Sequence, residues 1–478
     1  MQDVIIIGCG VVGAACAYRL SRFQLRITVL EALSDVAGGT TKANSAILHA
    51  GYDPEPDTKM ARLNVEGVRM AEEICAKLDV PYRKTGSLVL AFSQEDCALL
   101  RTLMERGEKN GVTGLGLLSG DEARALEPEL SGEVLEALLA PSAAIVNPWE
   151  YALAMAETAV RNGVELHRSC PVTAIAREEE GFAVTTPRGV FHARYIINAA
   201  GVHADRVHQL IGEASFAIHP AKGEYYLLDK SEGTRVNRVI FQCPGPMGKG
   251  VLVSPTVHGN LIVGPTAEPS GPEDTSNTAR GLNTVRELAA RSVPGVRFRE
   301  NIRNFAGVRA GSGRGDFIIE ESPTVPGFFN AAGICSPGLS AAPAIADELI
   351  GLLAEKGLPL EEKDNFTDTR RRIRFHDLDD RARNELIAAD PRYGRVVCRC
   401  ETVTEGEILA CLRAPIPPAS VNGVKRRVGA GMGRCQGGFC GPRVQEILAR
   451  ELGVSPAAVP LEEPGSYILT GETKEAWS

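Results

Sequence analysis

Four of the twelve cysteines stand close together near the end of the sequence, where Cys398 and Cys400 are followed by Cys435 and Cys440. Four thiolates that converge can hold a metal ion or an iron–sulfur cluster. Structural zinc sites usually contain a CxxC pair, and the spacings CxC and CxxxxC differ from that pattern. Disulfides are disfavoured in a reducing compartment. The spacing therefore predicts a site for iron–sulfur or zinc, and the absence of any metal remains a third alternative.

A glycine-rich turn at the start of the sequence predicts a second site. The apolar run Val4–Ile7 is typical of a buried strand, and it leads into GCGVVG and then into a segment with helical spacing. Gly8 permits the tight turn, Gly10 lets a pyrophosphate approach the backbone, and Gly13 allows close packing of helix on strand. The next predicted strand, RITVLE, ends at Glu31, whose carboxylate would bind ribose hydroxyls. This unit predicts a dinucleotide site.

Two later segments favour FAD over an exchanging nicotinamide. YIINAAGVHAD, residues 195–205, predicts a strand that ends in small residues and lets a cofactor pass close to the backbone. Residues 327–353 predict a strand, a glycine-rich turn and a helix whose N-terminus could face a pyrophosphate or flavin. Such widely spread contacts suit a large, permanently bound cofactor. With one complete fingerprint in the sequence, we do not expect a separate NAD(P)H site.

Length and charge narrow the class of protein. A chain of 478 residues exceeds one hydrophobic core and should divide into two or three domains. A net charge of −8 argues against nucleic-acid binding. No apolar run approaches the ~20 residues that span a bilayer. Glycines interrupt the first apolar stretch, and no positive charge precedes it, so we interpret it as structure and expect a cytoplasmic protein.

Four motifs together carry a family resemblance: VIIIGCGVVG…VLE, GTTKANSAILHAG, IINAAGVHAD and GICSPGLSAAPAIA. In this order they resemble the D-amino-acid-oxidase-like FAD-dependent oxidoreductases, over roughly residues 1–365. Within that family, NSAILHAG is similar to the FAD-dependent glycerol-3-phosphate dehydrogenases and the 2-hydroxyglutarate oxidases.

The resemblance implies an α/β fold, in which a Rossmann-like FAD-binding domain is interleaved with an antiparallel-sheet substrate domain. We expect the FAD-binding domain at 1–80, 146–215 and 305–365, and the substrate domain at 81–145 and 216–304. The charged segment 366–392 is interpreted as a linker. A small helical domain at 393–455 and a C-terminal tail at 456–478 complete the chain.

The resemblance also implies which side chains act on a substrate. His49 would accept the proton of a hydroxyl group, and Arg309 would bind an anionic group with its guanidinium. Lys222 and Tyr226 are weaker candidates, and His258 fits a turn residue better than a catalytic one. For His49 and Arg309 the alternatives are a structural histidine and a surface ion pair. The residues implied to bind FAD are Gly8, Gly10, Gly13, Glu31, Thr40, Thr41, Asn44, Ser45, Val172, Ala199, Ala200, Gly201, Gly307, Gly333, Pro337, Gly338, Leu339 and Ser340.

The C-terminal region resembles the bacterioferritin-associated-ferredoxin-like [2Fe-2S] domains, through CRCETVTEGEI and GMGRCQGGFCGPRV. This implies that Cys398, Cys400, Cys435 and Cys440 ligate a [2Fe-2S] cluster. Basic residues near the ligands in sequence would offset the negative charge of the cluster: Arg399, Lys425, Arg426, Arg427 and Arg434. A flavin followed by a cluster suits a dehydrogenase that passes electrons singly to another protein.

An FAD domain with this C-terminal extension is the arrangement of the catalytic subunits of anaerobic glycerol-3-phosphate dehydrogenases. It implies oxidation of sn-glycerol 3-phosphate to dihydroxyacetone phosphate, with electrons leaving through the cluster to a partner subunit or quinone. The enzyme would then be cytoplasmic, with a partner able to bring it to the inner face of the cell membrane. Two alternatives stay open: a dehydrogenase of a 2-hydroxy acid or amino acid, and an electron-transfer subunit without its own substrate.

Overall fold

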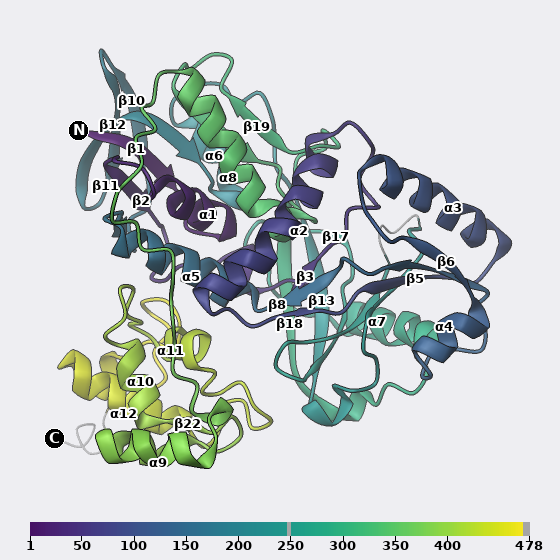
Figure 1. The fold of residues 1–478 in the computed structure, drawn as a ribbon. Helices are drawn as coiled ribbons and strands as arrows, with labels where there is room; N and C mark the ends of the chain where they lie inside the picture. Colours follow the sequence, from purple (N-terminus) through teal and green to yellow (C-terminus); the bar gives the residue numbers. More distant parts are fainter. Residues whose placement is uncertain (246–249, 472–478) are drawn as a thin grey trace. The chain divides into compact units, whose positions relative to one another are not determined.

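The computed structural model describes residues 1–245 and 250–471, and the chain divides into two compact units (Figure 1). The large unit contains Met1–Leu30, Ala37–His167 and Pro171–Thr369. The small unit contains the chain from Arg370 onward together with two short segments, Glu31–Val36 and Arg168–Cys170. Residues 246–249 of the expected substrate domain and 472–478 of the expected tail lie outside the described residues.

The first sheet of the large unit has the order expected for a dinucleotide-binding fold. Its strands follow β10-β11-β12-β1-β2-β9, and β20 pairs with β12 and β19. The pairings β12–β1, β1–β2, β2–β9 and β12–β20 are parallel, so the carboxyl ends of these strands share one edge. The strand bounds are β1 Gln2–Ile7, β2 Ile27–Leu30, β9 Glu165–His167, β10 Ala174–Glu178, β11 Gly181–Thr186, β12 Gly189–Asn198, β19 Ile318–Glu321 and β20 Phe328–Ala332.

Apolar residues explain why this sheet is buried. Val4–Ile7 of β1 are buried without interruption, as in a strand that is covered on both faces. Helix α1 contacts α5 and α8, and α2 contacts α8, which places a helical layer against the sheet (Figure 1). The helix bounds are α1 Val11–Leu20, α2 Lys59–Leu78, α5 Pro148–Arg161, α6 Ala204–Gln209 and α8 Gly338–Glu355.

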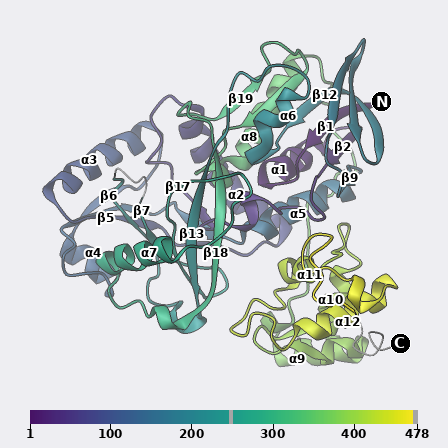
Figure 2. The ribbon, with the colours of Figure 1, turned by 180° about the vertical axis from the view of Figure 1, so that it is seen from behind.

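The second sheet forms the rest of the large unit and is antiparallel apart from the pairing of β14 with β5. Its order is β17-β13-β16-β15-β14-β5-β7-β6, and the long strand β18 pairs with β13 (Figure 2). The strands are β5 Ser87–Ala91, β6 Gly116–Ser119, β7 Glu136–Ala140, β13 His219–Leu228, β14 Val239–Gln242, β15 Leu252–Pro255, β16 Leu261–Gly264, β17 Glu268–Pro269 and β18 Asn301–Gly311. The region also contains helices α3 Gln94–Lys109, α4 Gly120–Leu126 and α7 Ala279–Ser292.

A small three-stranded sheet contains the strand that directly precedes His49. Strand β3 is Ile47–Leu48, and it pairs with β8, Ala144–Val146, which also pairs with β4, Tyr82–Lys84. All residues of β3 and β8 are buried, so the chain is held firmly just before His49.

The small unit is mostly helical around one apolar core. A short hairpin of β21, Val396–Cys398, and β22, Val403–Thr404, precedes the helices α10 Glu405–Cys411, α11 Val421–Val428 and α12 Gly441–Leu452. Thr404 and Glu407 form a capping box at the start of α10. The segment expected as a linker contains helix α9, Asp380–Ala389. Within the described residues, no helix has both the length and the apolar character needed to cross a membrane.

Candidate active site and cysteine cluster

The turn from β1 to α1 is tightly packed against the end of β12. Gly8 has φ +97°, and a Cβ there would lie 2.6 Å from the carbonyl oxygen of Ala199. A Cβ on Gly13 would collide with the carbonyl of Gly8. Both positions therefore require glycine, for conformation at Gly8 and for helix–strand contact at Gly13.

The N-terminus of α1 is suited to an anion. Its N-cap, Gly10, offers no side-chain cap, and no acidic residue stands in the first turn. The N–H of Val11 donates to Thr41 Oγ1 at 2.9 Å, which ties the helix to the loop 39–45. Helix α8, which contacts α1, likewise begins without a side-chain cap or an acidic first turn. Two helix N-termini without local negative charge fit the diphosphate of a dinucleotide.

Open space accompanies these helix ends. A Cβ built on Gly39 or Gly201 would meet no atom within 4 Å, and one on Gly10 would meet Thr41 alone. Glu31 directly follows β2, and its carboxylate accepts the N–H of Leu33 at 2.8 Å. Several positions predicted to bind FAD thus lie at the carboxyl ends of β1, β2 and β12 and at the start of α8, where parallel sheets bind ligands: Gly8, Gly10, Glu31, Ala199, Ala200, Gly201, Gly338, Leu339 and Ser340.

The loop 39–45 is fixed against β18. Thr40 Oγ1 donates to the carbonyl of Val308 at 2.6 Å, and a Cβ on Gly307 would collide with the carbonyl of Ala43. Asn44 Nδ2 donates to the carbonyls of Thr40 and Thr41 at 3.2 and 2.8 Å. Gly307 and Asn44, which were both predicted to bind FAD, therefore hold the loop 39–45 in its conformation.

The other predicted cofactor residues lie in loops and at the start of α8. Val172 is half-buried in the loop before β10. Gly333 follows β20, Pro337 is the N-cap of α8, and Gly338 and Leu339 open that helix. Ser340 is fully buried, and its hydroxyl oxygen accepts a hydrogen bond from the backbone N–H of His49.

His49 is held at three points. Its N–H donates to Ser340 Oγ at 2.7 Å, and its carbonyl accepts from Asn64 at 3.0 Å. Its ring nitrogen Nε2 lies 3.2 Å from Ser336 Oγ. The imidazole also stacks with Phe241, with ring centroids 5.5 Å apart. A histidine fixed this firmly is suited to proton transfer in a defined direction.

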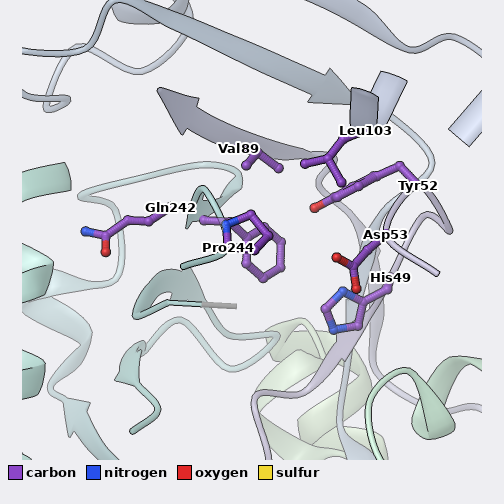
Figure 3. Close-up of a pocket in the computed structure, with 8 residues that line it drawn as sticks. His49, Tyr52, Asp53, Val89, Leu103, Gln242 and Pro244 are labelled. Atoms are coloured by element: carbon purple, nitrogen blue, oxygen red, sulfur yellow. The ribbon is translucent and has the colours of Figure 1, made fainter. Parts of the chain in front are cut away.

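A pocket opens beside this histidine (Figure 3). The carboxylate of Asp53 faces the imidazole of His49 there, and the hydroxyl of Tyr52 points into the same space. Burial raises the pKa of the Tyr52 phenol, so the group stays protonated at neutral pH. The pocket is lined by His49, Tyr52, Asp53, Val89, Leu103, Phe241, Gln242 and Pro244.

The register of β13 and β18 decides which side chains share a face with Arg309. Arg309 pairs with Ala221, and Phe305 pairs with Tyr225, with which it stacks at 4.7 Å. Since partners and alternate residues share a face, Tyr225 and Arg309 lie on the same side of the sheet. Tyr225 Oη lies 3.2 Å from Ser45 Oγ, which connects this face to the loop 39–45.

Lys222 and Tyr226 lie on the opposite face. Lys222 is buried, and its ammonium group contacts Asp274 Oδ2 at 3.0 Å and Ser276 Oγ at 3.1 Å. Tyr226 belongs to an apolar core cluster and packs edge-on against Phe298. The structure therefore does not bring these two together with Arg309.

His258 lies in the exposed turn between β15 and β16. Its Nε2 is 3.0 Å from Asn147 Nδ2, and Asn147 is the N-cap of α5. This placement agrees with a turn residue.

Sequence reasoning missed three residues of this region: Asp53, Tyr225 and Ser336. Ser336 stands inside the quoted motif GICSPG, so its hydroxyl was a visible signal. Tyr225 could have been separated from Tyr226 only by the strand register. Asp53, four residues after His49, carried no signal of its own.

The four late cysteines form two close pairs. Cys400 Sγ lies 3.8 Å from Cys435 Sγ, and the thiols of Cys398 and Cys440 hydrogen-bond to each other. Two sulfurs bound to one metal at about 2.3 Å in tetrahedral geometry lie about 3.8 Å apart. Among the described residues, no three His, Cys, Asp or Glu side chains are grouped to hold a single ion. Two separate pairs fit a two-iron cluster better than one zinc ion.

The local hydrogen bonds favour thiolates in one member of each pair. The hydrogen bond with Cys440 lowers the pKa of Cys398 to about 6. A backbone hydrogen bond from Phe439 helps to lower the pKa of Cys435. Thiolates are the form that binds iron, so these hydrogen bonds favour the ligand form of Cys398 and Cys435.

Comparison with known proteins gives two family matches. Residues 3–352 match the family model "FAD dependent oxidoreductase", and residues 396–450 match "BFD-like [2Fe-2S] binding domain".

Individual relatives extend the likeness. The chain is 47% identical to a glycerol 3-phosphate dehydrogenase of Caloramator mitchellensis, over 99% of both chains. It is 28% identical to a mitochondrial L-2-hydroxyglutarate dehydrogenase of Arabidopsis thaliana, over 73% of this chain and 82% of that protein. Among solved structures, the dithionite-reduced L-alpha-glycerophosphate oxidase of Mycoplasma pneumoniae with FAD bound is similar, with a TM-score of 0.74 and 31% identity over 77% of this chain and 98% of that one.

Proposed function

The chain belongs to the FAD-dependent oxidoreductases and ends in a BFD-like [2Fe-2S] binding domain, and from this premise we propose that it oxidises sn-glycerol 3-phosphate to dihydroxyacetone phosphate. It is an FAD-dependent dehydrogenase whose cofactors are FAD and a [2Fe-2S] cluster. The observation that carries the substrate is the 47% identity, over 99% of both chains, to a glycerol 3-phosphate dehydrogenase.

His49 accepts the proton of the C2 hydroxyl in this proposal. Its ring is held by Ser336 and by stacking on Phe241, so the orientation of the ring nitrogens is fixed. Asp53 faces the imidazole and would stabilise its charged form once the proton has moved. Burial of the pocket side chains Val89, Leu103 and Phe241 limits access of water to that proton.

Arg309 binds the phosphate of the substrate in this proposal. It lies on the face of β18 that also presents Phe305, opposite Tyr225 of β13. Arg309 Nη2 contacts the carbonyl of Thr266 at 3.3 Å, which leaves further guanidinium N–H groups for phosphate oxygens. A substrate held at its anionic end has its hydroxyl-bearing carbon in a fixed position.

When bound, FAD would supply two-electron oxidation of the substrate and a [2Fe-2S] cluster would supply one-electron transfer. The residues Cys398, Cys400, Cys435 and Cys440 would hold that cluster. A fused electron-transfer domain implies a redox partner or quinone. We place that partner in a complex that brings the enzyme to the inner face of the cell membrane, where quinone is reduced.

A second substrate class is favoured by the similarity to L-2-hydroxyglutarate dehydrogenases. A guanidinium binds carboxylate and phosphate equally well, so Arg309 is compatible with both. A 2-hydroxy acid would use the same proton acceptor and the same cofactor.

Anaerobic reduction of the bound flavin tests the proposal directly. Glycerol 3-phosphate should bleach the flavin absorbance at micromolar to millimolar concentrations, while L-2-hydroxyglutarate and amino acids should not. Bleaching by L-2-hydroxyglutarate alone would transfer the assignment to the hydroxy acids. If no small alcohol or acid bleaches the flavin and a protein donor does, the chain is an electron-transfer subunit instead.

A further inference from the structure

One phenylalanine next to a cluster ligand in sequence is exposed to solvent. Phe439 stands between Cys435 and Cys440, and at 88% exposure it is the most exposed large apolar side chain in the described part of the protein. Its position is not that of a loose tail, because its backbone N–H donates to the Cys435 sulfur. The preceding turn is also closed, with Gly438 N–H donating to the Cys435 carbonyl at 3.0 Å. A fixed backbone therefore presents an apolar ring to solvent.

Phe439 is tied through its backbone to Cys435, one of the two paired cysteines that reach the surface. Cys400 is exposed and Cys435 partly exposed, whereas Cys398 and Cys440 are only 1% and 2% exposed. An electron that leaves the cluster crosses the least protein on the side of Cys400 and Cys435. A partner in contact with Phe439 would stand at that side.

The segments that carry the cysteine ligands contain more arginine than acidic residues. The two ligand-bearing stretches, 398–401 and 433–443, carry three arginines against one glutamate: Arg399, Arg434, Arg443 and Glu401. All three arginines are exposed. Arg443 contacts Glu446 at 2.8 Å and Glu405 at 3.7 Å, but its side chain remains 49% exposed. An apolar centre with a charged rim is the usual anatomy of a protein interface, and a basic rim selects an acidic partner.

We propose that Phe439 and the rim Arg399, Arg434 and Arg443 form the docking surface for an acidic one-electron redox protein. This inference rests on the proposed function, because it concerns the exit of electrons through the cluster. The partner's apolar contact covers the Phe439 ring, and its carboxylates face the three arginines. The electron passes from the Cys400 and Cys435 edge, so that the cluster is oxidised by one electron and the partner is reduced by one.

The test uses the full-length protein loaded with FAD and iron, and an acidic flavodoxin as the probe. Binding of the oxidised proteins is measured first, by calorimetry, without any turnover. Stopped-flow mixing with reduced flavodoxin then follows electron entry into the cluster, which uses the same surface in reverse. Both the affinity and the second-order rate should fall at least tenfold between 50 and 500 mM salt, because the attraction is electrostatic.

Two variants test the Phe439 ring and the basic rim, and a third tests whether any exposed apolar residue has the same effect. Phe439→Ser should weaken flavodoxin binding about tenfold, and Arg434→Glu should weaken it further. The matched control is Leu452→Ser, since Leu452 is a 43% exposed apolar residue in the same unit at the end of α12. It should bind flavodoxin as the unchanged protein does.

Two control measurements on the cluster and several contrary outcomes complete the test. Dithionite should reduce the cluster equally in all variants, and iron content should be unchanged; iron loss in Phe439→Ser would instead make the ring a shield of the cluster. Equal affinity of all variants, no binding of flavodoxin, or tighter binding of the basic carrier cytochrome c would each refute the acidic partner. Flavin bleaching by glycerol 3-phosphate is measured separately, so failure of the substrate proposal leaves this result readable.

Discussion

At the scale of single residues, the site depends on side chains that are oriented by their neighbours. His49 is held through its N–H, its carbonyl and its ring, by Ser340, Asn64 and Ser336. His258, by contrast, is an exposed turn residue whose ring nitrogen contacts Asn147. The difference in their surroundings separates a residue suited to proton transfer from one that ends a turn.

Replacing His49 with glutamine should remove the proton acceptor and keep most of the pocket. We expect the rate of flavin reduction by glycerol 3-phosphate to fall by about 10²–10⁴-fold, the usual contribution of general base catalysis. Stopped-flow absorbance under anaerobic conditions measures this rate, and FAD content is checked on the same sample. His258→Gln is the control and should change the rate less than twofold; an equal loss in both variants would remove the proton-acceptor role from His49.

Replacing Arg309 with lysine keeps the charge and removes the forked hydrogen bonds. Because a guanidinium binds phosphate through two parallel N–H groups, we expect KM to rise by about 10–100-fold with a smaller change in kcat. Steady-state kinetics with an artificial acceptor give both values. Arg314→Lys is the control, since Arg314 contacts Glu320 at 3.1 Å on the surface. A normal KM in Arg309→Lys would exclude Arg309 as the phosphate ligand.

At the scale of elements, one short segment belongs to a different unit from its neighbours in sequence. Segment Glu31–Val36 follows β2 but clusters with the C-terminal part of the chain. Asp35 within it is 3% exposed, and its carboxylate accepts two hydrogen bonds from Arg427, at 2.7 and 2.8 Å. Arg426 adds a third at 3.1 Å. Burial alone would raise the pKa of Asp35, but the two guanidinium groups outweigh it and hold the pKa well below its usual range.

Breaking this buried pair should cost more than breaking a surface pair. Arg427→Met would leave Asp35 buried without its bidentate partner but with the hydrogen bond from Arg426, so we expect a loss of about 1–3 kcal/mol of stability. The double variant Asp35→Leu/Arg427→Met should recover most of that loss, because the buried carboxylate is gone and Arg426 keeps its ion pair with Glu462. Arg381→Met is the control: its pair with Glu385 lies at the surface, and about 0–1 kcal/mol is expected. Denaturant unfolding followed by cluster absorbance measures these three variants beside the unchanged protein, and a double variant less stable than Arg427→Met would contradict the argument.

The same scale shows how far the sequence could predict the molecule. Local patterns were sufficient for the β1–α1 turn, for the long helix α8 and for the two families, which the comparisons confirm. The face of a strand is not local: Tyr225 and Tyr226 are neighbours, and only the pairing with β18 places Tyr225 beside Phe305 and Arg309. The assignment of Glu31–Val36 to the small unit depends on Arg427, almost 400 residues further along the chain, and no short pattern contains that information.

At the scale of the whole molecule, the proposed function assigns substrate chemistry and electron exit to separate units of one chain. The large unit carries His49, Arg309 and the positions predicted to bind most of the FAD, and the small unit carries the four paired cysteines. The two functions should therefore be separable by mutation.

Replacing both Cys400 and Cys435 with serine should interrupt the electron path and spare the flavin chemistry. One close sulfur pair would be lost, so iron binding should fall to less than a tenth of the normal amount. Glycerol 3-phosphate should still bleach the flavin at nearly the normal rate, because His49 and Arg309 lie in the other unit. Reoxidation of that flavin by a one-electron protein acceptor should fall by at least tenfold.

The control for this variant is Cys411→Ser. Cys411 lies in the same unit and is buried, it stands outside the two ligand motifs in the sequence, and its thiol contacts the carbonyl of Ile408 in α10. It should keep its iron and its electron transfer. Iron analysis, visible spectra and acceptor kinetics together decide the case: a Cys400/Cys435 variant that stays loaded with iron would exclude these sulfurs as ligands, and one that loses iron but still reduces the protein acceptor normally would send the electrons out by another route.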